Sequence, residues 1–130
     1  MERKKMELTR NELEIMEVLW GAGRPITSVE IVQMSVKKSW KDSSIHILIN
    51  SLLKKEAIRE AGFVRAGKGF ARTFEPTESG ETYYADYLAT IANKTSVSTL
   101  FSALFKSKDL SKDTIQELEE MLNKKKQELE

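Results

Sequence analysis

Few residues of this 130-residue chain could take part in catalysis or bind a metal ion. The absence of Cys excludes disulfides, thiolate zinc sites and cysteine nucleophiles. The one His, His46, leaves a single candidate base and cannot form a two-His metal site within the chain. No paired carboxylates stand beside it, and Gly67-Lys68-Gly69 joins two predicted strands instead of opening a phosphate-binding helix. We therefore expect no enzyme activity, no cofactor and no metal site.

The outward face of a predicted amphipathic helix after Asp42 is suited to a different chemistry, the recognition of duplex DNA. Apolar residues recur at offsets 0, 3, 4, 7 and 8 from Ile45, and at 100° per residue Asn50 points away from that stripe. An α-helix fits the major groove, where an Asn amide can bind adenine through two hydrogen bonds. The candidate DNA contacts on and beside this helix are Lys41, Ser43, Ser44, His46, Ile47, Asn50, Ser51 and Lys54.

A basic hairpin is predicted directly after this helix. Residues 58–64 and 70–74 have the pattern of two strands around the turn Gly67-Lys68-Gly69. Residues 24–76 carry ten Lys or Arg and five Asp or Glu, so the basic excess lies on the second helix, the third helix and the hairpin. Such a hairpin can lie along neighbouring phosphates, and one of its cations could enter the minor groove instead. The candidates are Arg65, Lys68 and Arg72.

Each of these features also has an ordinary structural explanation. Lys37-Lys38 and Lys54-Lys55 are consistent with solvated surface charge. His46 is either a surface histidine or a DNA contact, and Ile47 either meets a thymine methyl group or packs beneath the hairpin. The prediction of DNA binding therefore depends on helix, hairpin and charge occurring together.

Capping signals mark the helices that must position this face. Thr9 with Glu12 and Thr27 with Glu30 have the spacing of a capping box, and Ser111 is a third candidate cap. The predicted helices cover residues 10–20, 28–38, the segment capped by the Asp42 carboxylate, a segment from about residue 77, a short segment after the polar break at residues 93–98, and residues from 112 onward. In the second helix, Ile31, Val32 and Met34 are expected to face inward.

The predicted fold is mainly α with a small β-hairpin wing. A winged helix-turn-helix occupies residues 1–76, and a separate helical region occupies residues 77–130. The charged segment Met1–Glu7 is followed by no long apolar stretch, so we expect no signal peptide, no membrane association and a cytoplasmic location.

With these elements in order, the chain resembles the penicillinase and methicillin-resistance repressor family, of the BlaI/MecI/CopY type. The resemblance extends over nearly the whole chain, and the order and spacing of its segments carry it. These segments are Leu8-Thr9-Arg10-Asn11-Glu12-Leu13-Glu14-Ile15-Met16-Glu17-Val18-Leu19-Trp20, Trp40-Lys41-Asp42-Ser43-Ser44-Ile45, Phe74-Glu75-Pro76, Ser98-Thr99-Leu100-Phe101-Ser102-Ala103-Leu104, Leu110-Ser111 and Glu117-Leu118-Glu119-Glu120-Met121-Leu122.

The resemblance implies a homodimeric transcriptional repressor that binds a palindromic operator in double-stranded DNA. It also implies a candidate inactivating protease system, which in the antibiotic branch cleaves between Asn and Phe. The matching bond here, Leu104-Phe105, has Leu in place of Asn, and the cysteine cluster of the copper branch has no counterpart. A winged-helix module that binds proteins and not DNA is the alternative. The predicted dimer contacts in residues 77–130 are Tyr84, Leu88, Leu100, Leu104, Phe105, Leu118 and Leu122.

Overall fold

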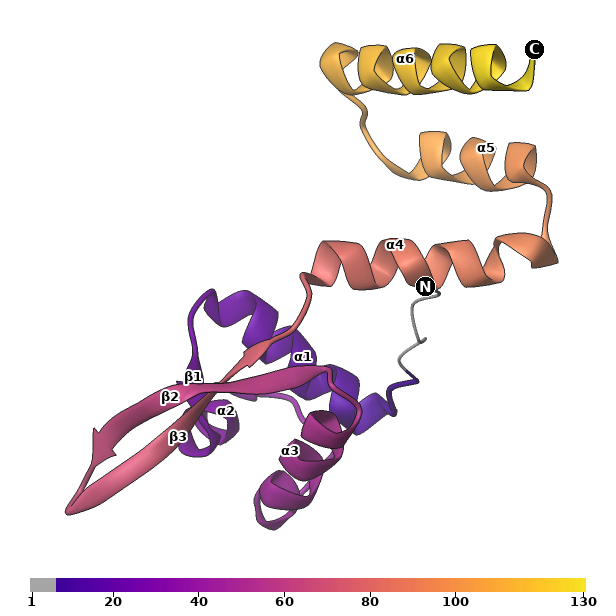
Figure 1. Ribbon diagram of the computed structural model, residues 1–130. Helices are drawn as coiled ribbons and strands as arrows, with labels where there is room; N and C mark the ends of the chain where they lie inside the picture. Colours follow the sequence, from indigo (N-terminus) through magenta and orange to yellow (C-terminus); the bar gives the residue numbers. More distant parts are fainter. Residues whose placement is uncertain (1–6) are drawn as a thin grey trace. The chain divides into compact units, whose positions relative to one another are not determined.

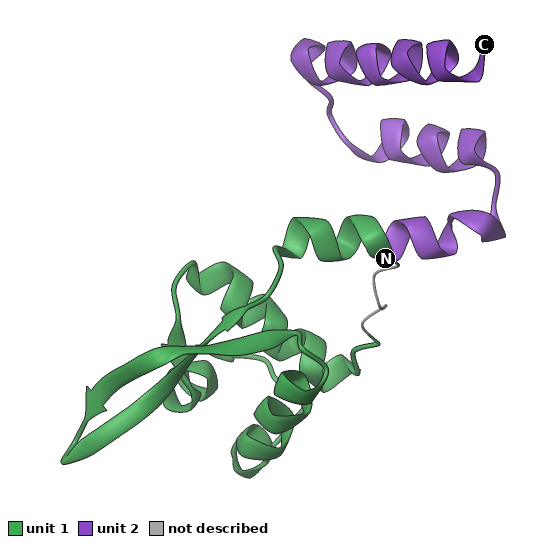
Figure 2. Cartoon of the chain, viewed as in Figure 1, with its two compact units in different colours: residues 1–86 green, residues 87–130 purple. Residues whose placement is uncertain are grey.

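The computed structural model describes residues 7–130 and contains a mainly helical chain with one small antiparallel sheet. This confirms the fold class predicted from the sequence. The chain divides into two compact units, one ending at Asp86 and the other formed by Tyr87–Glu130 (Figure 2). Residues 1–6, which carry most of the charged start of the chain, lie outside the described residues.

The first unit is a winged helix, with three helices packed beside a three-stranded sheet (Figure 1). The strand order is β1-β3-β2, and both pairings are antiparallel. The elements are α1 (Arg10–Ala22), β1 (Ile26–Thr27), α2 (Ser28–Met34), the 3-10 turn η1 (Asp42–Ser44), α3 (Ile45–Lys54), β2 (Ile58–Ala66) and β3 (Gly69–Pro76).

The core lies where the three helices meet the base of the sheet. Ile15 and Leu19 of α1, Ile31 of α2, and Ile49 and Leu52 of α3 are at most 1% exposed. Burying apolar side chains of this size contributes about 1.5–3 kcal/mol each relative to leaving them in water. The apolar stripe of α3 is therefore the side that attaches this helix to the unit, as its periodicity predicts.

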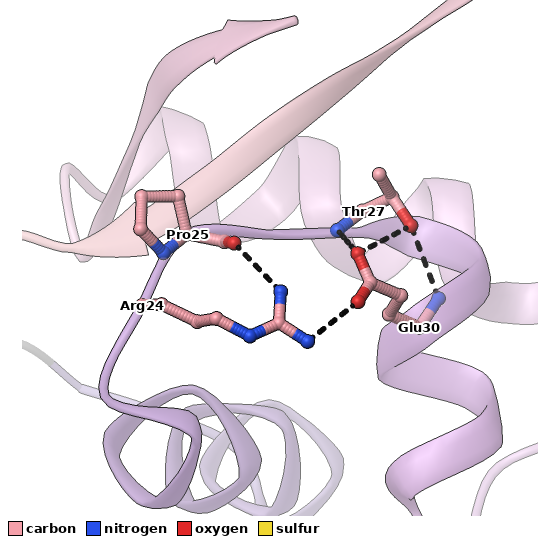
Figure 3. Close-up of polar contacts among 4 residues, drawn as sticks. All are labelled: Arg24, Pro25, Thr27 and Glu30. Atoms are coloured by element: carbon pink, nitrogen blue, oxygen red, sulfur yellow. Dashed lines mark hydrogen bonds and ion pairs between the residues drawn. The ribbon is translucent and has the colours of Figure 1, made fainter. Parts of the chain in front are cut away.

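The predicted capping boxes are present and fix where α1 and α2 begin. The Thr9 hydroxyl accepts a hydrogen bond from the Glu12 amide, while the Glu12 carboxylate accepts one from the Thr9 amide. Thr27 and Glu30 make the same reciprocal pair, and Arg24 donates to the free Glu30 oxygen at 2.8 Å (Figure 3). Both helix starts thus have amide donors satisfied by nearby side chains.

Two helix ends differ from the prediction. Helix α1 continues through Gly21 to Ala22 and ends at Gly23, whose φ of 66° lies in the left-handed region that favours glycine. Helix α2 ends at Met34 and does not reach Lys38. The Ser35 hydroxyl donates to the Ile31 carbonyl at 2.6 Å, and the Ser35 amide donates to the Val32 carbonyl at 3.2 Å. Met34, predicted to face inward, is 42% exposed because the helix ends there.

The entry to α3 and the third strand also differ from the prediction. The Asp42 carboxylate forms an ion pair with Lys38 at 2.7 Å and does not cap α3, which is preceded by the turn η1. Strand β1 was not predicted. Its two residues pair with Thr73 and Phe74 of β3, and two residues are too few to show a strand period.

Residue Glu56, just after α3, has a φ of 61° although it is not glycine. A side chain in this region is disfavoured by roughly 1 kcal/mol because Cβ approaches the following carbonyl oxygen. We expect Glu56→Gly to raise the free energy of unfolding by about 0.5–1 kcal/mol, measured by urea denaturation. Exposed Glu60→Gly, in strand β2, serves as the control and should lower it.

The helices that follow are α4 (Gly80–Ile91), α5 (Val97–Ser107) and α6 (Lys112–Leu129), with a 3-10 turn, η2 (Ala92–Lys94), after α4. The start of α4 belongs to the first unit. Just before α4 the Trp20 indole donates to the Glu78 carbonyl at 3.0 Å, and within α4 the Tyr84 hydroxyl donates to Glu17 at 2.9 Å. The Ser111 hydroxyl caps α6, as predicted. No residue of these three α-helices is fully buried.

Candidate nucleic-acid interface

The outward face of α3 is open to solvent as its periodicity predicts. On α3, Asn50 and Lys54 are exposed and Ile47 is 73% exposed, and Ser43 in the preceding turn η1 is exposed as well. This excludes the alternative that Ile47 packs beneath the hairpin. A large apolar side chain with that exposure stands beside an amide and a cation, a combination that could read base edges.

The other candidates beside this face differ in their surroundings. Lys41 and His46 are exposed, and Ser44 is half-buried at the end of η1. Ser51 is half-buried, and its hydroxyl donates to the Glu12 carboxylate at 2.6 Å. The Ser51 hydroxyl is therefore engaged with α1, whereas Asn50 next to it remains on the solvent side.

Glu12 is the centre of a polar cluster that attaches α3 to α1. Its side chain is 2% exposed and accepts hydrogen bonds from the Thr9 amide at 2.8 Å, Ser51 at 2.6 Å and the Lys55 ammonium at 2.6 Å. Burial raises the pKa of Glu12, but the hydrogen bonds from Lys55, Ser51 and Thr9 outweigh it and lower the pKa to about 2. The carboxylate is therefore ionised at neutral pH and holds the carboxyl-terminal turn of α3.

The connection from α2 to α3 is also attached to α1. The Ser39 amide and hydroxyl donate to the two oxygens of Glu14, at 2.9 and 2.6 Å. These hydrogen bonds lower the pKa of Glu14. Carboxylates of the first helix thus hold both the carboxyl-terminal turn of α3 and the segment that leads from α2 toward α3. Neither contact was predicted from the sequence.

The hairpin carries its cations near its tip. Arg65 and Lys68 are exposed, and Gly67 takes a φ of 58° in the two-residue turn between β2 and β3. Arg72 forms an ion pair with Glu60, and its guanidinium lies 5.2 Å from the centroid of the Phe74 ring. Arg65 and Lys68 are therefore more available to phosphates than Arg72 is.

The candidate dimer residues show two kinds of surroundings. Tyr84 packs on Trp20, and burial together with its hydrogen bond to Glu17 raises its pKa to about 12. Within the second unit, an open groove of about 490 Å³ between α5 and α6 is lined in part by Phe105, Leu118 and Leu122. Leu100 and Leu104 are half-buried on α5, and Leu88 is exposed on α4.

Among the described residues, no group of three or more His, Cys, Asp or Glu side chains could hold a metal ion. Within residues 7–130, no helix is both long enough and apolar enough to cross a membrane.

Comparisons of the sequence with known proteins find relatives over nearly the whole chain. A family model described as penicillinase repressor matches residues 8–124. The methicillin resistance regulatory protein MecI of Staphylococcus aureus (strain N315) is 27% identical over 96% of this chain and 100% of its own length. An uncharacterized 16.5 kDa protein of Latilactobacillus sakei is 27% identical over 92% of this chain and 80% of its own.

Among solved structures, the adhesin competence repressor AdcR of Streptococcus pyogenes aligns with a TM-score of 0.47 and 13% identity, covering 98% of this chain and 84% of that one. The family assignment rests on the sequence matches, because the family model covers the winged helix and nearly all of the helical region that follows it. This chain is a winged-helix transcriptional repressor that belongs to the penicillinase repressor family.

Proposed function

We propose that the protein represses transcription by binding, as a homodimer, a palindromic operator in duplex DNA in the cytoplasm. The observation that carries this proposal is the outward face of α3, which leaves Asn50 and the apolar Ile47 in solvent. In a monomer, an isoleucine side chain that is 73% exposed contributes almost no free energy of burial. Against a major groove it can bury its side chain on a thymine methyl group.

In the proposed complex, each protomer places α3 in one of two successive major grooves about 34–36 Å apart. Asn50 binds adenine, and the exposed cations hold phosphates on either side. Each phosphate neutralised releases counterions, so affinity falls with salt at a log-log slope of about −0.9 per contact. The remaining proposed contacts to bases or phosphates are Lys41, Ser43, Ser44, His46, Lys54, Arg65, Lys68 and Arg72. Ser51 is left out because its hydroxyl donates to Glu12.

The proposed dimer contact comes from residues 77–130, while residues 1–76 bind DNA. Support comes from the second unit, where Phe105 is 51% exposed and Leu122 is 62% exposed beside the groove between α5 and α6. A second copy of the chain can cover these side chains. The proposed contacts are Tyr84, Leu88, Leu100, Leu104, Phe105, Leu118 and Leu122.

A protease that inactivates the repressor remains a proposal from family resemblance. The bond Leu104-Phe105 lies inside α5, with Leu104 half-buried. A protease needs an extended strand of substrate, so cleavage there requires α5 to unfold locally.

The experiment that tests the function is selection of bound duplexes from a random pool, followed by gel shifts of the recovered sequences. Recovery of a two-fold symmetric site with half-sites one helical turn apart supports the proposal.

The alternative function is a winged-helix module that binds proteins and not DNA. One observation favours it, the presence of a single Lys, Lys54, on α3. Absence of any shift at salt below about 50 mM would favour that alternative.

Replacing Asn50 with Ala tests base readout by α3. We expect the variant to lose its preference at one base pair of each half-site, at a cost of about 1–3 kcal/mol there, because the bidentate amide contact is gone. Competition gel shifts with single-base operator variants measure this preference. Gln33→Ala, an exposed amide on α2, is the control. An equal loss of affinity for every sequence would remove Asn50 from base readout.

A further inference from the structure

The outer half of the hairpin has one face on which two aromatic and two arginine side chains alternate. Phe63 pairs across the strands with Arg72, and Arg65 pairs with Phe70. Directly opposed residues of antiparallel strands share a face, and so do residues two apart in one strand. These four residues therefore form a single surface, named here the aromatic–arginine face.

The aromatic rings of this face are unusually open to solvent. Phe63 is 67% exposed and Phe70 is 76% exposed. Nearer the base of the hairpin, Ile58 and Phe74 occupy the same face and are only 2% exposed, because the helices cover them there. The hairpin extends beyond the three helices, as Figure 1 shows. The face that is buried near the base of the hairpin therefore continues outward with apolar residues that no described residue of the first unit covers.

The charge and the shape of the outer hairpin point to a polyanion with a narrow groove. Residues 61–74 contain Arg65, Lys68 and Arg72 and no Asp or Glu. Arg72 is paired with Glu60, so Arg65 and Lys68 supply the positive charge that is open to solvent. The opposite face near the tip carries small residues, with Ala66 paired to Gly69. A Cβ placed on Gly67 or Gly69 would meet nothing within 4 Å, so the tip is slender. The minor groove of B-DNA is about 6 Å wide and lined by phosphates on both sides.

We propose that the aromatic–arginine face enters the minor groove of duplex DNA, where Phe63 and Phe70 act as an apolar wedge that partly unstacks a base step and bends the duplex. Arg65 and Lys68 hold the flanking phosphates. Apolar side chains inserted in this way kink DNA by about 20–90°. This inference rests on the proposed function, since α3 must bind the same duplex, and it adds a second contact that distorts the DNA.

The wedge makes sequence preference depend on how easily a base step deforms. Pyrimidine–purine steps such as TA unstack most readily, so a site with such a step beside each half-site binds more tightly than one without. This preference arises without a hydrogen bond from the wedge to any base. It adds to the preference set by Asn50.

The test uses a duplex recovered by the selection described above, with 2-aminopurine at the base step beside one half-site. The variant Phe63→Ala/Phe70→Ala removes the wedge. Val64→Ala is the matched control, because Val64 is 44% exposed on the other face of the same strand. Circular-permutation gels measure the bend, 2-aminopurine fluorescence measures unstacking, and anisotropy measures the Kd. Thermal melting checks that each variant is folded.

We expect the wild type and Val64→Ala to bend the duplex by at least about 20° and to raise the fluorescence. The double variant should melt as the wild type does, lose both signals and bind at least about tenfold more weakly. Lys68→Ala should keep the bend and flatten the salt slope by about one unit.

Other outcomes separate this inference from the proposed function. If the double variant binds, bends and unstacks the duplex as the wild type does, the wedge is wrong and operator binding stands. If the wild type binds the matching single strand more tightly than the duplex, and the two Phe residues account for it, the face is a single-strand platform and the minor-groove proposal is overturned. If no duplex is bound, and an acidic peptide is bound instead through this face, the inference and the proposed function both fail.

Discussion

Glu12→Gln lowers the free energy of unfolding by about 2–3 kcal/mol at neutral pH, measured by urea denaturation. The amide side chain keeps the size of Glu12 but removes the charge that accepts from Ser51 and Lys55. Hydrogen bonds to a buried charged group contribute more than neutral ones. The Gln side chain has one acceptor oxygen and an NH2 donor in place of the other, so Ser51 or Lys55 loses its acceptor and faces a second donor. We expect this to be the largest effect of any isosteric substitution in the winged helix, because the cluster joins α1 to α3.

The same substitution should make the free energy of unfolding depend less on pH below about pH 5. The pKa of Glu12 is lowered from an ordinary value of 4.5 to about 2, so its contribution is fully present above about pH 5. It is lost as the pH falls through the interval from 4.5 to 2, because the unfolded state then binds a proton that the folded state resists. The wild type should lose about 3 kcal/mol more than Glu12→Gln across this interval.

A double-mutant cycle with Lys55→Met shows whether the effect belongs to the cluster. The two substitutions together should cost less than their sum, with a coupling of at least about 1 kcal/mol. Glu81→Gln, at an exposed position in the first turn of α4, is the matched control and should change stability by less than about 0.5 kcal/mol. Equal acid sensitivity of the wild type and Glu12→Gln would show that Glu12 titrates normally in the folded state.

Leu122→Glu raises the dissociation constant of the proposed homodimer at least about 100-fold, measured by sedimentation equilibrium. Leu122 lies on α6 in the groove between α5 and α6 and is 62% exposed in the single chain. A carboxylate at this position does little to the isolated chain, where it remains in water. In a dimer it must be desolvated against apolar side chains, which costs several kcal/mol unless it is paired.

Lys124→Gln is the matched control, because it makes the same change in net charge on the same helix at an exposed position about 200° around the axis from Leu122. It should leave the dimer intact. Leu122→Glu should also weaken operator binding, because two separate monomers bind the half-sites independently and lose the affinity gained when a dimer holds both. An unchanged dissociation constant for Leu122→Glu would place the dimer contact elsewhere than this groove.

The sequence alone determined the features that depend on residues a few positions apart. The capping boxes at Thr9 and Thr27 were predicted correctly, and so were the stripe of α3, the turn at Gly67 and the exposure of Asn50. Each of these is set by hydrogen bonds or periodicity within one or two turns of chain, so the pattern of residue types is sufficient.

Only the tertiary structure decided which distant residues satisfy one another. Ser51 and Glu12 are 39 positions apart, and no local pattern identifies them as partners. Asp42 pairs with Lys38 and does not cap α3, and β1 exists only because β3 supplies its partners. The exposed state of Phe63 likewise follows from how far the helices reach along the hairpin. Hydrogen bonds between distant residues, and the burial of the hairpin by the helices, depend on where whole helices and strands lie. Residue types and their spacing within one segment do not determine those positions.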